Sequence, residues 1–226
     1  MIQTISNKQT VRPARSRWGC RMPFLCLLLT GLLLLQPITA QEIQTLPIAM
    51  KSTTVQYEGT IRRVQNLVMI RTVLTVTQPE VPRLIDGVTR FSVPSVETFR
   101  LPAHVPDSLF QAAMEAKQQI MMAQGHFQVA VQLCGERLTV CAQQLEQAAI
   151  YYRKAQDLLY KYQNRQAATL AETVLTELEQ LTDRVRAGNP LGEHFDTYYE
   201  AVNSLLHACL SFATGFDDQY RCVVFN

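Results

Sequence analysis

Apolar residues recur at alternating steps of three and four between Phe110 and Tyr162, and we call this set the apolar seam. Its positions are Phe110, Ala113, Lys117, Ile120, Gln124, Phe127, Val131, Cys134, Leu138, Cys141, Leu145, Ala148, Tyr152, Ala155, Leu159 and Tyr162. Fourteen of these sixteen are apolar or cysteine, and only Lys117 and Gln124 interrupt the pattern. Two apolar positions in every seven make a narrow stripe on an α-helix that a partner helix must cover. The seam therefore predicts a packing surface and indicates no chemistry.

Helical character extends beyond the seam, from about residue 108 to residue 187. Asp107 or Ser108 suits the N-cap, and Gly188 followed by Pro190 suits the end. An unbroken helix of that length would span about 120 Å, so we expect breaks at Gly125, Gly135 or 163–164. A last helix is predicted for residues 193–213. If residues 167–213 cover the seam, the protein can be monomeric; if the helix continues past residue 163, a second chain is needed.

The segment 41–78 has the composition of β-strands. Apolar and polar residues alternate from Val55 to Ile61, and the run Leu67–Val76 is apolar on nearly both faces, which predicts burial on both. Gln65 and Asn66 separate the two runs, and asparagine tolerates the backbone of a tight turn. These features predict a β-hairpin over about residues 53–77 that packs on the helices, because a lone hairpin is marginally stable in water.

Residues 79–106 contain half of the prolines in the chain, which suppress helix and central strand. We therefore expect an extended, proline-rich connector there. The expected division is a signal peptide at 1–40, a β-hairpin segment at 41–78, the connector at 79–106, a helical domain at 107–214 and a tail at 215–226. The predicted fold is mainly α: an antiparallel helical bundle or long helical hairpin with a short N-terminal β-hairpin.

The first forty residues have the order of a secretory signal. Five basic residues and no acidic one precede an apolar run from Phe24 to Leu35, and Ala40 offers a small residue for cleavage. The alternative, a membrane anchor, is disfavoured because twelve residues span about 18 Å of a bilayer core of about 30 Å. Cleavage would leave sixteen basic against nineteen acidic residues, a net charge of −3. We therefore expect a secreted or extracytoplasmic protein, periplasmic if bacterial, without a membrane span in the mature chain and without nucleic acid as a partner.

Four cysteines, at positions 134, 141, 209 and 222, would remain in the mature chain, and export favours disulfides. Cys134 and Cys141 would lie about 10.5 Å apart along a continuous helix, whereas a disulfide needs Cα atoms within about 7 Å. They can pair only if Gly135 breaks the helix. We therefore favour bridges from this helix to Cys209 and Cys222, with unpaired seam cysteines as the alternative.

Candidate chemistry is sparse. The four histidines lie far apart, no cysteine pair has zinc-ligand spacing, and no phosphate loop or nucleophile elbow is present, so we predict no metal, cofactor or catalytic site. The carboxylate pairs 177/179 and 217/218 are interpreted as solvated. Tyrosine suits interfaces because one end is apolar and the other polar. Two interpretations of the tyrosine pairs stay open. The tyrosines form an interaction face, or one of each pair packs in the seam and the other lies at its edge. The residues are Tyr151, Tyr152, Tyr160, Tyr162, Tyr198 and Tyr199.

One family has a similar layout. Tyr57-Glu58-Gly59, the apolar run Leu67–Val76, a proline-rich stretch and two cysteines seven apart together resemble the N-terminal subunit of baculovirus F-type envelope fusion proteins and related insect retroelement envelope proteins. The similarity covers roughly residues 50–160. The basic cleavage site, fusion peptide, anchor and glycan sites of that family are not found in the sequence. The resemblance therefore implies an anchorless envelope fragment without fusion activity.

The sequence as a whole favours an exported, non-enzymatic binding or structural protein that uses the seam or the tyrosine-bearing faces for a protein partner or for self-association. The envelope-like surface protein is one alternative. A small exported enzyme is the other, and a deep pocket joining two or more of His126, Glu136, Asp157 and Tyr160 would favour it.

Overall fold

The computed structural model describes residues 43–77, 90–191 and 195–218, all within the unit formed by residues 41–226. The predicted signal at 1–40 lies outside the described residues. The strands are β1 (Ile43–Lys51), β2 (Val55–Val64), β3 (Leu67–Thr77), β4 (Arg90–Arg100) and β5 (Thr214–Asp218). The helices are α2 (Asp107–Leu133), α3 (Leu138–Lys161), α4 (Arg165–Arg186) and α5 (Asp196–Cys209).

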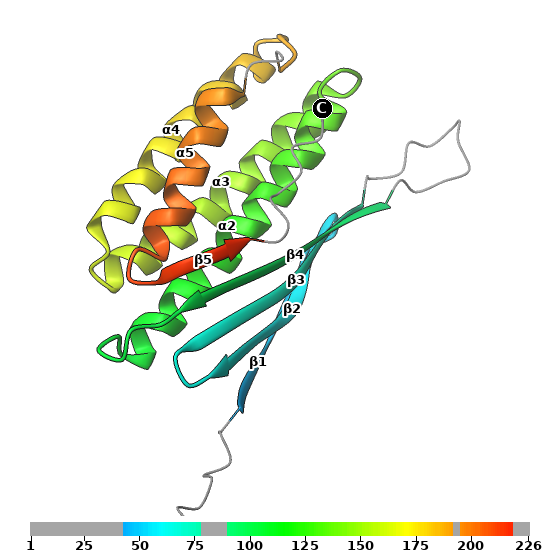
Figure 1. The fold of residues 1–226 in the computed structure, drawn as a ribbon. Helices are drawn as coiled ribbons and strands as arrows, with labels where there is room; N and C mark the ends of the chain where they lie inside the picture. The colour runs from blue at the N-terminus through cyan, green and yellow to red at the C-terminus, as the bar shows by residue number, and fades with distance from the viewer. Residues whose placement is uncertain (1–42, 78–89, 192–194, 219–226) are drawn as a thin grey trace, which may run out of the picture. The chain divides into compact units, whose positions relative to one another are not determined.

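The five strands form one antiparallel sheet in the order β1-β2-β3-β4-β5 (Figure 1). The predicted hairpin is confirmed: β2 and β3 pair from Val55↔Val76 to Val64↔Leu67 around the two-residue turn at 65–66. Gln65, and not Asn66, has the positive φ of that turn, 55°. The hairpin therefore forms the centre of a larger sheet.

The prediction of a mainly α fold was wrong, because the sheet has five strands and the fold is a sheet with helices packed on it. The predicted connector 79–106 contains β4, and the predicted tail 215–226 contains most of β5. β1 also adds a strand outside the predicted hairpin. Neither β4 nor β5 shows a clean apolar–polar alternation in the sequence. The prolines of the segment also argued against a strand where β4 forms.

Pro94 fits within β4 because its nitrogen faces away from β3. The backbone N–H of Leu101 donates to the carbonyl of Asn66, which sets the alternation of hydrogen-bonded pairs between these strands. By that alternation Pro94 and Val73 form a pair without mutual hydrogen bonds, so the missing N–H of proline is not needed. The described pairing of β4 with β5 extends only as far as Glu97, so no described strand lies opposite the other edge of Pro94.

The long helical region is divided into separate helices, as expected. Residues 134–137 form a turn between α2 and α3, and Gln163, with a φ of 60°, ends the next helix before Asn164 caps α4. Gly125 does not break α2. It allows α2 to approach the sheet, since a Cβ at this position would lie 2.4 Å from Cγ1 of Val55.

The described helices lie on one side of the sheet (Figure 1). α2 contacts β1, β2 and β3, while α3, α4 and α5 pack around α2 and each other. The face beneath α2 contains Val55, Ile70 and Leu74, all buried. The prediction that β3 is buried on both faces was wrong, because Leu67 is 46% exposed and Met69 and Val73 are half-buried.

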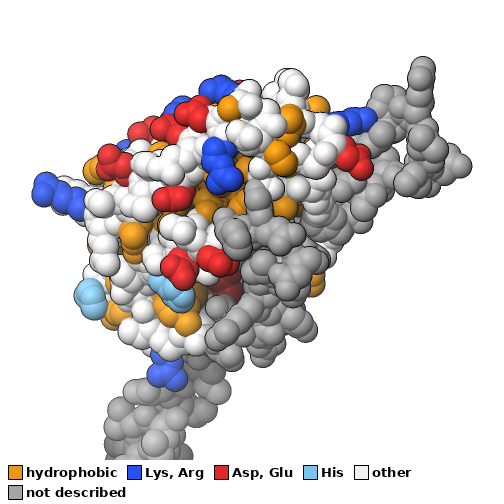
Figure 2. Space-filling view, turned by 90° about the horizontal axis from the view of Figure 1, so that it is seen from above, with side chains coloured by type: hydrophobic (Ala, Val, Ile, Leu, Met, Phe, Trp, Pro, Cys, Tyr) orange, Lys and Arg blue, Asp and Glu red, His pale blue; other side chains and the backbone are white. Residues whose placement is uncertain are grey.

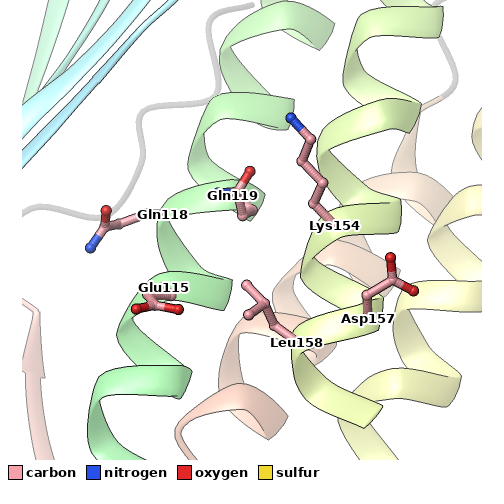
Figure 3. Close-up of a pocket in the computed structure, with 6 residues that line it drawn as sticks. All are labelled: Glu115, Gln118, Gln119, Lys154, Asp157 and Leu158. Carbon is pink, nitrogen blue, oxygen red and sulfur yellow. The ribbon is translucent and has the colours of Figure 1, made fainter. Parts of the chain in front are cut away.

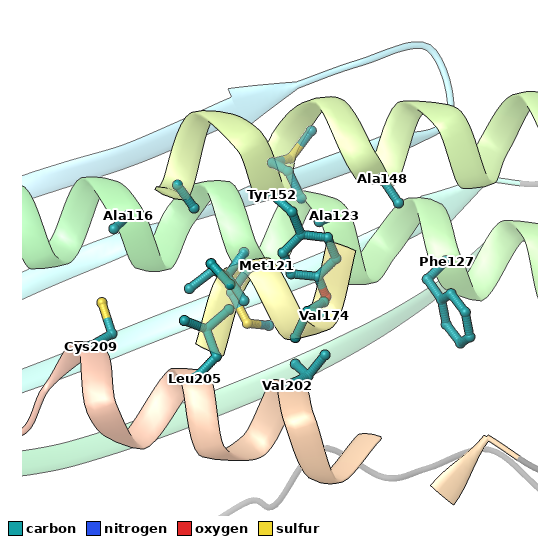
Figure 4. Packing of buried hydrophobic residues seen from close by; sticks show 14 of the residues in the cluster. Ala116, Met121, Ala123, Phe127, Ala148, Tyr152, Val174, Val202, Leu205 and Cys209 are labelled. Carbon is teal, nitrogen blue, oxygen red and sulfur yellow. The ribbon is translucent and has the colours of Figure 1, made fainter. Parts of the chain in front are cut away.

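The apolar seam lies inside the protein, as Figure 4 shows for part of it. Twelve of its sixteen residues are buried, and the other four are half-buried. Its cover comes from the chain itself, because Val174 on α4 and Val202 and Leu205 on α5 belong to the same core. Of the two alternatives, the one in which residues 167–213 cover the seam is therefore confirmed.

Candidate functional site on the open face of the sheet

The sheet has one face that no described helix contacts, and we call it the open face. Alternation along the paired strands assigns its positions. They are Ile43, Thr45, Pro47, Ala49 and Lys51 on β1, Gln56, Glu58, Thr60, Arg62 and Val64 on β2, Leu67, Met69, Arg71, Val73 and Thr75 on β3, and Ser92, Pro94, Val96, Thr98 and Arg100 on β4.

Arginines surround apolar side chains in one part of this face. Met69 is paired across the strands with Arg62, and Leu67 is paired with Val64 on one side and Arg100 on the other. Arg71 follows Met69 by two residues on β3, so it points to the same side. Arg62, Arg71 and Arg100 are exposed. We call these residues (Arg62, Val64, Leu67, Met69, Arg71 and Arg100) the arginine-rimmed patch.

The three arginines form no ion pair with a carboxylate whose side chain is described. The helical layer differs: there Arg153 pairs with Glu179 at 2.9 Å and Arg186 with Glu146 at 2.8 Å. Figure 2 shows acidic and basic side chains interspersed on the surface seen from above. The open face also contains acidic positions. Glu58 lies there and is hydrogen-bonded to Gln56, and Asp217 occupies the strand position opposite Thr98.

Proline protects the outer edge of β1, which pairs with no described strand. The backbone N–H of Ser52 donates to the carbonyl of Val55, so Pro47 and Thr60 fall at a pair without mutual hydrogen bonds. The nitrogen of Pro47 therefore faces the outer edge of β1, so the middle of this edge lacks one hydrogen-bond donor. Edge-to-edge pairing with another strand is disfavoured, and the open face is the better candidate for partner contact.

A second surface feature lies between α2 and α3. It is an open hollow of about 380 Å³ lined by Glu115, Gln118, Gln119, Lys154, Asp157 and Leu158 (Figure 3). Of the four residues whose convergence would favour an enzyme, only Asp157 lines it. His126 packs beside Gln144, and Glu136 lies in the turn after α2. The hollow therefore supplies no support for the enzyme alternative.

The structure fully buries two of the six tyrosines of the predicted interaction face. Tyr152 and Tyr198 are buried, Tyr151, Tyr162 and Tyr199 are half-buried, and Tyr160 alone of the six is exposed. The hydroxyls of Tyr152 and Tyr198 lie 2.9 Å apart, and Nε2 of Gln124 donates to both, at 2.5 and 3.1 Å. Burial raises the pKa of Tyr198 well above its usual value. These two side chains therefore stabilise the core and are not available to a partner.

Lys117, the other interruption of the seam, pairs inside the protein with Glu97 of β4 at 2.5 Å. The two side chains are 8% and 17% exposed. Burial acts to lower the pKa of Lys117, but the attraction of Glu97, the hydrogen bond to it and smaller contributions from Tyr57 and Cys209 together raise the net pKa. The thiol of Cys209 lies nearby and donates to the carbonyl of Ala113, and burial raises its pKa to about 12.

His126 of α2 is buried and its contacts are with α3. Its Nδ1 lies 2.8 Å from Oε1 of Gln144, and its Nε2 has no partner among the described residues. Its ring stacks on Tyr151 with centroids 5.4 Å apart. Burial lowers the pKa of this histidine, so the neutral ring is favoured. No group of His, Cys, Asp and Glu among the described residues is arranged to hold a metal ion.

Cys134 and Cys141 lie at disulfide distance from each other, with Cα atoms 5.1 Å apart. The bridges we favoured, from this helix to Cys209 and Cys222, differ from this arrangement. The physical reason is the turn at residues 134–137, which removes the separation that a continuous helix would impose. Cys209 is free and buried, and Cys222 lies outside the described residues.

Comparisons with known proteins add no relative: no family model, no curated protein and no solved structure matches this chain. The resemblance to envelope fusion proteins therefore stays a prediction. Within the described residues, no helix combines the length and apolar character needed to cross a bilayer. The arginine-rimmed patch was missed in the sequence, although its signal was present: β3 is apolar on both faces, and one helical layer can cover only one of them.

Proposed function

We propose that this chain is an exported, non-enzymatic binding protein that contacts a protein partner through the open face of its sheet. The surface carrying this function differs from the one expected from the sequence. The seam and the buried tyrosines are occupied by contacts within the chain, so they are not available for recognition.

The observation that carries the proposal is the uncovered apolar centre of the arginine-rimmed patch. Leu67 is exposed in a strand whose opposite face is buried, with Met69 and Val64 half-buried beside it. An apolar centre within a polar rim is the usual anatomy of a protein interface. The protection of the β1 edge by Pro47 supports the face, and not the edge, as the contact surface.

The test compares two matched substitutions in the full chain, produced by a host able to export it. Leu67→Asp introduces a charge into the open face, and Ile150→Asp introduces the same charge on α3, where the replaced residue is 40% exposed against 46% for Leu67. Biotinylated wild-type and variant proteins are incubated with the producing cells and their medium, and the proteins bound to each are recovered. We expect wild type and Ile150→Asp to capture the same protein in equal amounts, and Leu67→Asp to capture at least tenfold less of it.

Equal retention by Leu67→Asp and wild type would contradict the open face as the binding surface. Circular dichroism of each variant separates lost binding from lost folding. Export is read in the same experiment by mass spectrometry of the released protein, whose first residue should be Gln41. Recovery of the chain only inside the cell, still beginning at Met1, would contradict export.

A further inference from the structure

The geometry points to a polypeptide that carries acidic residues beside apolar ones, lying in extended form, as the partner of the arginine-rimmed patch. This inference rests on the proposed function and specifies the chemistry of the partner. Arginine presents a planar fork of donors that matches a carboxylate with two hydrogen bonds. Arg62 and Arg71 are exposed and have no ion-pair partner among the described carboxylates.

The spacing of these arginines fits an extended partner. Arg62 is paired with Met69, and Arg71 lies two residues beyond Met69 on β3. Such diagonal neighbours on adjacent strands have side chains about 7–8 Å apart. Residues two apart in an extended chain are separated by about 6.6 Å and point to the same side. Two acidic residues at positions i and i+2 can therefore meet both arginines.

The apolar part of the patch gives the partner its second feature. Leu67 and Met69 precede Arg71 at the same two-residue spacing on β3, so they form a row with it. Arg62 is paired with Met69, so a segment whose acids meet Arg71 and then Arg62 would place its next alternate residue over the paired Leu67 and Val64. An apolar residue there would remove Leu67 and Val64 from water, and this burial contributes more to the free energy of binding than exposed ion pairs alone.

Nucleic acid and membrane fit the patch less well. The open face has no aromatic residue at any of its positions in β1–β4, so it lacks the stacking platform on which single-stranded nucleic acid is usually bound. An anionic bilayer would require a larger apolar surface to insert, whereas the exposed large apolar side chains described on the open face are Leu67, at 46%, and Ile43, at 61%. An acidic, partly apolar polypeptide is the class that uses both features.

The experiment measures binding of a labelled 12-residue peptide by fluorescence anisotropy. The peptide has aspartate at two positions two apart and leucine at the next two alternate positions, and its control has asparagine in place of both aspartates. Full-length wild type is compared with Arg62→Gln/Arg71→Gln and with Arg165→Gln/Arg184→Gln. The latter pair removes the same charge from exposed positions of α4.

We expect wild type to bind the aspartate peptide in preference to the asparagine peptide, and to bind it more weakly as salt is raised. The open-face pair should weaken binding about tenfold, and the α4 pair less than twofold. Equal weakening by both pairs, or absence of binding to the aspartate peptide, would overturn the inference. Binding only to phosphatidylserine vesicles or to a single-stranded 20-nucleotide DNA would overturn it as well.

Failure here is distinguishable from failure of the proposed function. If the cellular partner is lost with Leu67→Asp but retained with Arg62→Gln/Arg71→Gln, the open face is the binding surface and the acidic chemistry is wrong. If Leu67→Asp also retains the partner, the surface itself is wrong.

Discussion

The pair formed by Lys117 and Glu97 gives the sharpest test of how the helical layer is attached to the sheet. Lys117 belongs to α2 and Glu97 to β4, and both side chains are mostly removed from water. Their mutual attraction offsets the desolvation of both charges, so removal of either partner leaves a buried charge without compensation. We therefore expect Lys117→Met or Glu97→Met alone to lower the free energy of unfolding by about 3–5 kcal/mol.

Removing both charges should have a much smaller effect. An apolar pair such as Lys117→Met/Glu97→Met carries no desolvation penalty, and such replacements in other proteins are neutral or stabilising. The two single changes should therefore be strongly non-additive: if each lowers the free energy of unfolding by about 3 kcal/mol and the double change lowers it by almost nothing, the coupling in a double-mutant cycle is about 6 kcal/mol. Urea unfolding followed by circular dichroism measures each corner of the cycle.

An exposed ion pair on the same protein provides the control. Arg153 and Glu179 join α3 to α4 at 2.9 Å, and both side chains are 58% exposed. Solvent screens this pair, so the same cycle there should give a coupling below about 1 kcal/mol. If the Lys117–Glu97 cycle gives a coupling as small as this control, the buried ion pair does not fix α2 to the sheet.

Two further predictions concern the helical layer. Gly125→Ala should lower the free energy of unfolding by about 1–2 kcal/mol in urea titration, because the clash with Val55 outweighs the better helix propensity of alanine. Gly135→Ala is the control: a Cβ there meets nothing within 4 Å, so the free energy of unfolding should be nearly unchanged. Equal effects of the two substitutions would contradict the close approach of α2 to the sheet. The lowered pKa of His126 means that the unfolded chain binds a proton that the folded chain does not, so stability should be fully present above about pH 6.5 and fall as pH decreases below it. Thermal unfolding at a series of pH values checks this, and His126→Gln should flatten the dependence; an unchanged slope would exclude His126 as its source.

The helices were largely predictable because their signals are local. The seam repeats every seven residues, Gly188 and Pro190 mark an end, and the breaks near 135 and 163 follow from the excessive length of an unbroken helix. The β2–β3 hairpin was predictable for the same reason. β4 was not, because a proline at a strand edge cannot be distinguished by sequence from a proline that breaks a strand. That distinction depends on which neighbour Pro94 faces, and the neighbours come from elsewhere in the chain.

The interruptions of the seam illustrate the same limit at the level of single side chains. Periodicity identifies Lys117 and Gln124 as polar residues on a buried stripe, but it does not show what satisfies them. Their partners are Glu97 in a strand that was not predicted and tyrosines on α3 and α5. Both residues thus mark places where the interior contains a polar contact specific to this arrangement, since a buried polar group is costly unless it is paired.

The candidate site has the opposite origin: β3 contains more apolar residues than packing against the helices requires. Leu67, Met69 and Val73 made β3 apolar on both faces, which led to the prediction of a strand buried on both sides. An antiparallel sheet covered by helices on one side needs apolar residues only on that side. Core packing therefore explains Val68, Ile70 and Leu74 but not the alternating set, and it is this apolar row rimmed by arginines that the proposed partner binding would account for.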